Sequence, residues 1–158
     1  MIEDQESLRR QVQHPRLLEL LDYWLTLGGG SRLPLKSEFD PAAIPRLLAN
    51  IVVKEVERDP LRFRIRLEGE QVSAARGFSA AGRYFDEPGV VVLKDDALEA
   101  YAEMVADCRP RYSDGAFSYK DGRGGRLYRL ALPFSREGRT VDFIIAGFYH
   151  ELGRGGGW

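Results

Sequence analysis

A strict alternation of arginine with hydrophobic residues at positions 62–67 is the feature that most constrains the fold. Successive side chains of a β-strand point to opposite faces, so the pattern predicts a strand with one buried and one solvated face. Phe63, Ile65 and Leu67 are expected on the buried face, and the three intervening arginines in water. This segment therefore favours a sheet that is covered on at least one side.

The residues that follow this strand predict short helices rather than another strand. Residues 70–76 lie between Gly69 and Gly77, which leaves room for one or two helical turns. Gly77 is placed to end that helix in a left-handed conformation. The chain then crosses at Gly82 into aromatic residues. A strand, a short helix and a glycine-rich crossing indicate a small α+β domain whose helices arch over one sheet face and enclose a ligand-sized cavity.

The N-terminal third is expected to be helical. A polar lead at residues 1–14 precedes Pro15, which suits the first turn of a helix. A helix at residues 15–27 is predicted from an apolar stripe of helical spacing, and shorter turns are expected at 40–44 and 46–48. The stripe consists of Leu17, Leu18, Leu21, Trp24 and Leu25.

Strands dominate the remainder of the chain. We expect strands at residues 51–57, 61–68, 109–119, 126–134 and 140–150, and a helix from about residue 96 to residue 107 with Leu98, Tyr101, Ala102 and Val105 on its inner face. Hairpins at both ends with helices between them predict a five-stranded antiparallel sheet with its helices on one face. The chain then divides into a lead (1–14), a helical cap (15–48), an α+β domain (49–150) and a flexible tail (151–158).

The last strand is apolar on both alternating faces after Asp142. Such a strand is typically covered on both sides. The middle helices can cover one side, so the N-terminal stripe is expected on the other, from the same chain or from a partner. We therefore expect a homodimer, with the following interface candidates: Leu17, Leu21, Trp24, Leu25, Ile144 and Phe148.

Composition excludes several classes of function. A net charge of −1 gives no general attraction to nucleic acid or to acidic membranes. The single cysteine, Cys108, excludes an intrachain disulfide, and residues 1–10 are too polar for a signal peptide. No segment approaches the ~20 apolar residues of a membrane helix. We expect a cytoplasmic protein.

Residues with chemical potential are scattered, so no catalytic or metal site is predicted. Cys108 has no histidine near it in sequence, and His14 and His150 lie near opposite ends of the chain without clustered carboxylates. The glycine-rich run at 122–125 lies between two strands and opens no helix, unlike a phosphate-binding loop.

Aromatic residues on the predicted strands and crossings are the best candidates for a ligand cavity. Small-molecule sites are usually apolar with a few hydroxyl groups and a charge. The same residues could instead pack a core without any ligand. The candidate cavity residues are Phe63, Ile65, Tyr84, Phe85, Tyr101, Tyr119, Tyr128 and Leu130.

The order of these elements resembles the PAS sensory domain, and several local strings are similar to a bacterial branch of single-domain PAS-like proteins. The similarity covers residues 14–150. It rests on the segments 14–18, 22–24, 40–48, 59–63 and 128–133 together with Gly69, Gly77, Gly82 and Gly138. The resemblance implies the PAS fold, a role in sensing, frequent dimerisation through the N-terminal helix, and a small ligand between sheet and helices.

Two PAS subtypes with known cofactors match poorly. Flavin photosensors carry a reactive cysteine within an Asn-Cys-Arg motif on a middle helix, whereas Cys108 lies between Asp107 and Arg109 at a predicted helix end. Haem sensors use a middle-helix histidine, and none occurs between His14 and His150. We therefore expect neither flavin nor haem. The expected function is a non-enzymatic sensory module that binds a small molecule or a protein partner. The alternatives are a scaffold with a filled core or, less favoured, a small enzyme using the same cavity.

Overall fold

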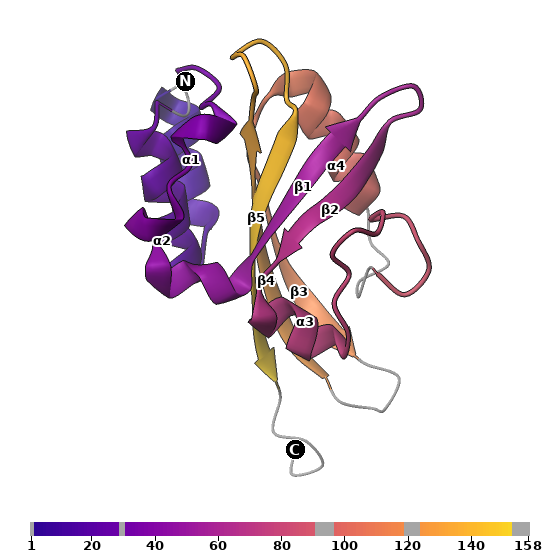
Figure 1. Cartoon of the computed structure of the whole chain (residues 1–158). Coiled ribbons are helices and arrows are strands. Elements are labelled where there is room, and N and C mark those ends of the chain that lie inside the picture. The colour runs from indigo at the N-terminus through magenta and orange to yellow at the C-terminus, as the bar shows by residue number, and fades with distance from the viewer. Residues whose placement is uncertain (1, 29–30, 91–96, 119–123, 153–158) are drawn as a thin grey trace.

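The computed structural model describes residues 2–28, 31–90, 97–118 and 124–152 (Figure 1). Four α-helices are present in this part of the chain: α1 (Ile2–Gln11), α2 (Pro15–Thr26), α3 (Glu70–Arg76) and α4 (Ala97–Asp107). Three short 3-10 helices connect α2 to the sheet: η1 (Lys36–Glu38), η2 (Pro41–Ala43) and η3 (Pro45–Asn50). The strands are β1 (Ile51–Glu57), β2 (Arg62–Glu68), β3 (Arg111–Ser118), β4 (Gly124–Phe134) and β5 (Phe143–Leu152).

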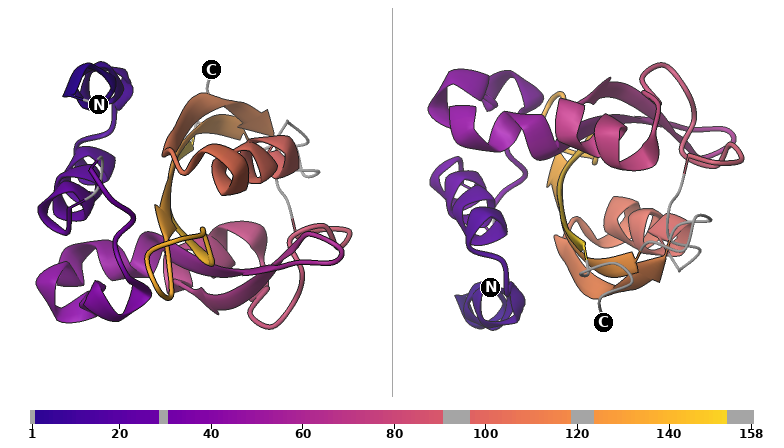
Figure 2. Two further views of the ribbon diagram at one scale, coloured as in Figure 1. Left: turned by 90° about the horizontal axis from the view of Figure 1, so that it is seen from above. Right: turned by 90° about the horizontal axis from the view of Figure 1, so that it is seen from below.

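The five strands form one antiparallel sheet in the order β2-β1-β5-β4-β3, which confirms the predicted α+β class. Figure 2 shows α4 lying inside the curve of the sheet, while α1 and α2 lie outside it. The described residues therefore form two hydrophobic cores, one on each face of the sheet. We call these the inner core, on the side of α4, and the outer core, on the side of α2.

Strand β5 is central and is covered on both faces, as its sequence predicts. Ile144 and Ala146 belong to the inner core, and Ile145 between them belongs to the outer core. Gly147 allows α2 to come close, because a Cβ atom there would lie 2.7 Å from a methyl group of Leu17. The absence of a side chain at this position thus sets the distance between helix and sheet.

Helix α2 packs on its own sheet. Leu17, Leu21 and Trp24 are buried within the chain, and Leu25 is partly buried beside them. The indole Nε1 of Trp24 donates a hydrogen bond to the carbonyl oxygen of Pro133 on β4 at 3.0 Å. The N-terminal stripe therefore covers the outer face in the same chain, which decides between the two alternatives left open by the sequence.

The grouping of Ile144 and Phe148 with the stripe of α2 was wrong. Both residues point to the inner core, and Ile144 is fully buried there. They lie on the opposite face of β5 from Leu17, because side chains alternate along a strand. The sheet surface that we expected a second copy to cover is thus covered by elements of the same chain.

A β-bulge changes the predicted exposure of Leu67. Phe63 and Ile65 are buried as expected, but Leu67 is 59% exposed. Val53 pairs with Leu67 and the adjacent Lys54 pairs with Ile65, so one extra residue is inserted in β2 at this point. Because a bulge shifts the alternation by one residue, Leu67 leaves the inner face.

The buried stripe of α4 also differs from the expected one. Ala97, Tyr101 and Met104 are buried, whereas Leu98 is 43% exposed. Helix α3, by contrast, has its predicted bounds and ends at Gly77 with a φ of 102°. Strand β5 begins later than expected and includes residues 151 and 152, which the sequence assigned to the tail.

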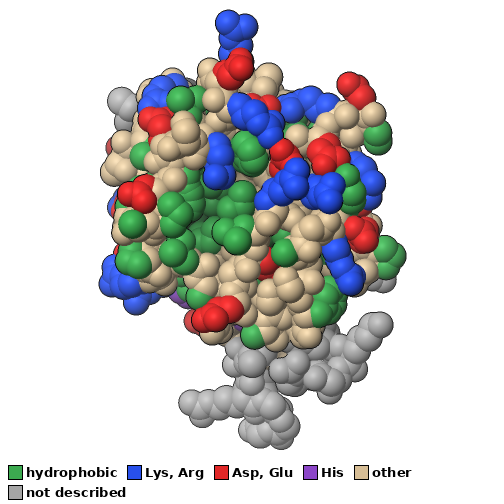
Figure 3. Space-filling model, viewed as in Figure 1, with side chains coloured by type: hydrophobic (Ala, Val, Ile, Leu, Met, Phe, Trp, Pro, Cys, Tyr) green, Lys and Arg blue, Asp and Glu red, His purple; other side chains and the backbone are tan. Residues whose placement is uncertain are grey.

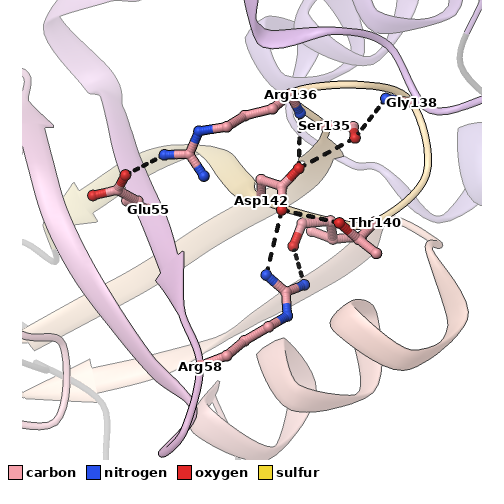
Figure 4. A network of polar contacts seen from close by, with 8 residues as sticks. Glu55, Arg58, Ser135, Arg136, Gly138, Thr140 and Asp142 are labelled. Carbon is pink, nitrogen blue, oxygen red and sulfur yellow. Dashed lines mark hydrogen bonds and ion pairs between the residues drawn. The ribbon is translucent and has the colours of Figure 1, made fainter.

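Asp142 joins the β1–β2 hairpin to the β4–β5 turn (Figure 4). Its carboxylate accepts hydrogen bonds from the Arg136 backbone N–H at 2.8 Å and from the Thr140 hydroxyl at 3.0 Å. It also forms an ion pair of 3.3 Å with Arg58. Partial burial favours a raised pKa of Asp142, but these contacts outweigh it and lower that pKa. The network fixes the two hairpins relative to each other.

The solvent face of β2 is a band of ion pairs. Arg62 binds Asp86 at 2.8 Å, and Glu55 of β1 pairs with both Arg66 and Arg136. Figure 3 shows this mixture of cationic and anionic side chains on the side of β1 and β2, next to a recess of hydrophobic side chains beside the N-terminal helices. The alternating arginines of β2 thus have carboxylate partners.

Candidate functional site

A small cavity of about 40 Å³ lies on the inner face of the sheet, under α3. Residues from β1, β2, β4, β5 and α3 line it, together with Phe85 and Val90 from the connection between α3 and α4. Its apolar lining includes Val52, Ile65, Val72, Leu127 and Phe148. Its polar lining consists of Lys54, Arg76, Arg129 and His150, and no acidic side chain lines it among the residues that the structure describes.

Lys54 is the most unusual of these residues, because only 1% of it is exposed. It projects from the centre of β1 and donates a hydrogen bond from Nζ to the hydroxyl of Tyr101 on α4 at 3.0 Å. Its Nζ lies 5.0, 4.8 and 4.9 Å from the ring centroids of Phe85, Tyr101 and Phe148, respectively. Three aromatic rings therefore provide cation–π contacts to the ammonium group.

These contacts do not fully compensate the ammonium group of Lys54 for its loss of hydration. The pKa of Lys54 is lowered to about 7, mainly by burial; the charges of Arg129 and Arg76 also lower it, and the charge of Glu68 raises it in part. The amine is therefore partly neutral at physiological pH, and a nearby anion would return it to the charged form.

Arg76 and Glu68 form a buried ion pair beside the cavity. Arg76 Nη1 lies 2.5 Å from Glu68 Oε1, which also accepts hydrogen bonds from the Ser73 hydroxyl at 2.7 Å and from the Ala80 backbone N–H at 3.0 Å. Burial favours a raised pKa of Glu68, but these bonds hold the pKa below its ordinary value. Glu68 thus stays ionised, and its Oε1 atom is bound by Arg76 and Ser73 of α3 and by the backbone of Ala80.

The last two polar residues come from the neighbouring strands. Arg129 of β4 donates from Nε to the hydroxyl of Ser113 at 2.9 Å. Burial lowers the pKa of His150, on β5, and the charge of Arg76 lowers it further. Nearby positive charge thus lowers the pKa of both Lys54 and His150.

Four of the predicted cavity residues lie together in the inner core. Phe63 meets Tyr101 edge to face at 5.4 Å between centroids, and Phe85 meets Tyr101 at 5.0 Å. Ile65 and Phe85 line the cavity directly. Tyr101 reaches it through Lys54.

Three further predicted cavity residues, all of them described, do not join them. Tyr128 and Leu130 belong to the outer core, so placing them in the same cavity was wrong: they follow β4 at the alternate positions to Arg129. Tyr84 lies at the sheet edge, where its hydroxyl donates to Glu57 Oε1 at 2.7 Å and its ring centroid is 3.6 Å from the guanidinium of Arg62. Tyr119 lies outside the described residues.

Sequence reasoning missed the four basic residues of the cavity. Lys54 carried a usable signal, since Val52 and Val56 flank it at alternate positions and so place it on their buried face. The alternation along β4 and β5 likewise places Arg129 and His150 on the inner face. This could be used only once it is known which face of each strand is the inner one.

Cys108 lies away from this cavity. It follows α4 with a φ of 61° and lines a separate groove of about 530 Å³ between α1, α2 and the start of β3. Burial raises the pKa of its thiol, and the charge of Asp107 raises it further. The thiol is therefore protonated at neutral pH.

No group of three or more histidine, cysteine or acidic side chains suited to a metal ion occurs in the described ranges. None of the helices in the described part of the chain has the length and hydrophobicity that a membrane span requires.

Comparison with known proteins identifies a domain family for this chain. A family model described as a PAS domain matches residues 12–141. A solved light-oxygen-voltage domain, from a study of a flavin analogue, is 14% identical with a TM-score of 0.51, covering 71% of this chain and 86% of its own. The PAS domain of Bordetella pertussis BvgS is 22% identical with a TM-score of 0.47, covering 67% and 79%, respectively. A PAS domain from Colwellia psychrerythraea is 12% identical with a TM-score of 0.49, covering 70% and 95%. No curated protein matches the chain.

Proposed function

Since the chain belongs to the PAS domain family, we propose that it is a non-enzymatic sensory module of the cytoplasm. In this proposal it binds a small molecule in the inner cavity and passes on the result by changing its contacts with a protein partner or with a second copy. The observation that carries the proposal is the cavity itself, which is enclosed by four strands and α3 around a buried lysine.

Strand β5 offers a route from the cavity to the outside of the sheet. Phe148 contacts Lys54 through its ring, and His150 lines the cavity. Tyr149 between them faces outward and stacks on His14, with centroids 4.3 Å apart and an interplanar angle of 24°. His14 caps α2 by accepting a hydrogen bond at Nδ1 from the Arg16 N–H at 3.1 Å. A shift of this strand end would therefore move the start of α2.

The described residues fit a flavin poorly. The cavity of about 40 Å³ is far smaller than a tricyclic ring system, and Cys108 lines the other groove rather than this cavity. The raised pKa of the Cys108 thiol also argues against nucleophilic catalysis. We accordingly propose a ligand other than flavin or haem and no covalent chemistry.

The small size of the cavity also favours a second candidate, a protein-interaction scaffold with a filled core. Space of about 40 Å³ holds only a few water-sized spheres. A scaffold needs no change in the cavity to bind its partner, whereas a sensor does.

A thermal-shift screen of small metabolites on the full chain separates the two. A sensor should give compounds that raise Tm and that change the NMR signals of both Phe148 and His14. Compounds that raise Tm without reaching His14 would contradict the proposed route along β5. The scaffold would be favoured by a screen without hits together with a crystal structure whose cavity holds only water.

A further inference from the structure

Lys54 forms no ion pair with a carboxylate in the described residues, although the charge of Glu68 acts on it and raises its pKa in part. Its hydrogen-bond partner is the Tyr101 hydroxyl, and three aromatic rings lie about 5 Å from its Nζ atom. A buried charge is costly unless it is paired. Lys54 therefore needs either to be neutral or to receive an anion.

The groups that face Lys54 from the surrounding elements increase this need. Arg76 comes from α3, Arg129 from β4 and His150 from β5, and all of them line the same cavity. The acidic group of β2, Glu68, does not line it and is held by Arg76. Two of these groups are guanidinium groups, and the charge of Arg129 affects the pKa of Lys54 more strongly than the charge of Glu68 does.

The size of the cavity limits which anion fits. A volume of about 40 Å³ gives room for about three water-sized spheres. A carboxylate group has three heavy atoms and two acceptor oxygens, which suits the ammonium group of Lys54. The remaining lining of aliphatic and aromatic side chains suits a short alkyl group rather than a second charge.

We propose that the inner cavity binds the carboxylate of a small aliphatic acid, with the ammonium group of Lys54 as its charged partner. This inference rests on the proposed sensory function and names the chemical class of the ligand. The partly neutral amine adds a measurable consequence: a bound carboxylate raises the pKa of Lys54 from about 7, so binding at pH 8 takes up a proton.

Acetate is the probe, and its uncharged isostere acetamide is the comparison. Both are titrated into the full chain by NMR at constant ionic strength, with sodium chloride as the balancing salt. We expect saturable changes at Lys54 and Phe148 with acetate, and at least about thirtyfold weaker binding of acetamide, which leaves the ammonium unpaired. Calorimetry at pH 8 in two buffers of different ionisation enthalpy should show proton uptake with acetate.

Lys54→Met removes the charge and keeps a long unbranched side chain. It should weaken acetate binding by at least about thirtyfold. Lys36→Met is the matched control, because Lys36 lies in η1 with its Nζ over the rings of Phe39 and Phe143, outside the cavity. Lys54→Arg, which keeps the charge, should retain part of the affinity if the variant is folded by circular dichroism.

The outcomes separate the inference from the proposed function. Equal binding of acetate and acetamide, or acetate binding that Lys54→Met leaves unchanged, overturns the carboxylate proposal but leaves a sensory cavity. If neither probe binds and a library of neutral compounds also gives no hit, both proposals fail. Acetate binding that is lost in Lys54→Met, kept in Lys36→Met and accompanied by proton uptake supports the inference.

Discussion

Lys54 makes stability depend on pH in a way that few single residues do. Its pKa is lowered by burial to about 7, against about 10.4 in an unfolded chain. Between these values the unfolded chain binds more protons than the folded one, so the free energy of unfolding rises with pH. Below about pH 7 the full penalty is present, because both states are protonated.

We predict that the titration of Lys54 alone raises the free energy of unfolding of the wild-type chain by about 1.5 kcal/mol between pH 7 and pH 8.5. Lys54→Met should remove that rise and stabilise the chain by about 1–4 kcal/mol at pH 7. Urea unfolding of both chains at several pH values measures the difference. Parallel curves for the two chains from pH 6.5 to pH 8.5 would show that Lys54 titrates normally.

At the scale of elements, the fit between α2 and β5 depends on a missing side chain. A Cβ atom at Gly147 would lie 2.7 Å from Leu17 Cδ2 and 3.0 Å from Leu20 Cδ2. Both leucines are buried, so they have little room to move away. The helix can approach the strand this closely only because position 147 is a glycine.

Gly147→Ala should therefore destabilise the chain by about 1–3 kcal/mol through overpacking. Gly115→Ala on β3 is the matched control, since a Cβ atom there meets nothing within 4 Å. Its effect should stay within about 0.5 kcal/mol. Chemical denaturation of both variants decides the matter, and equal stabilities would mean that α2 sits farther from β5 than described.

At the scale of the whole molecule, the homodimer stays a prediction. Most of the residues that the sequence suggested for its interface pack inside one chain instead. Leu17, Leu21, Trp24 and Ile144 are buried inside one chain. An interface must therefore use residues outside these cores, such as Gln11 and Arg109 beside Cys108.

We predict that Trp24→Ala costs about 3–5 kcal/mol of stability without changing the association constant, because Trp24 packs within its own chain. Arg139→Ala, at an exposed position between β4 and β5, should change neither the stability nor the association constant. Sedimentation at several micromolar concentrations measures association, and denaturation measures stability. A Trp24→Phe chain of near wild-type stability that no longer associates would contradict this assignment.

Local patterns were sufficient to predict most elements of this fold. The alternation at residues 62–65, the left-handed end of α3 at Gly77 and the doubly apolar β5 all follow from short-range rules. The exposure of Leu67 could not be predicted, because a bulge depends on how β2 pairs with β1. A single strand does not contain that information.

The candidate site was less accessible to sequence reasoning than the fold. Aromatic residues were correctly grouped where they share the inner face, as Phe63, Phe85 and Tyr101 do. The prediction for Tyr128 was wrong because tertiary packing determines which face of β4 meets α2. Lys54 was overlooked because a lysine in a strand is usually solvated, and its burial arises only when α4 and the connection to it close over the sheet.

The alternation of β5 between the cavity and α2 has a thermodynamic consequence. If Phe148 and His150 report the ligand while Tyr149 holds the cap of α2, the two sites share one coupling free energy. Such coupling is reciprocal. If the ligand changes the affinity of the chain for a protein that binds α2 and shifts His14, that protein must change the affinity for the ligand by the same factor. The partner would then set the concentration at which the sensor responds.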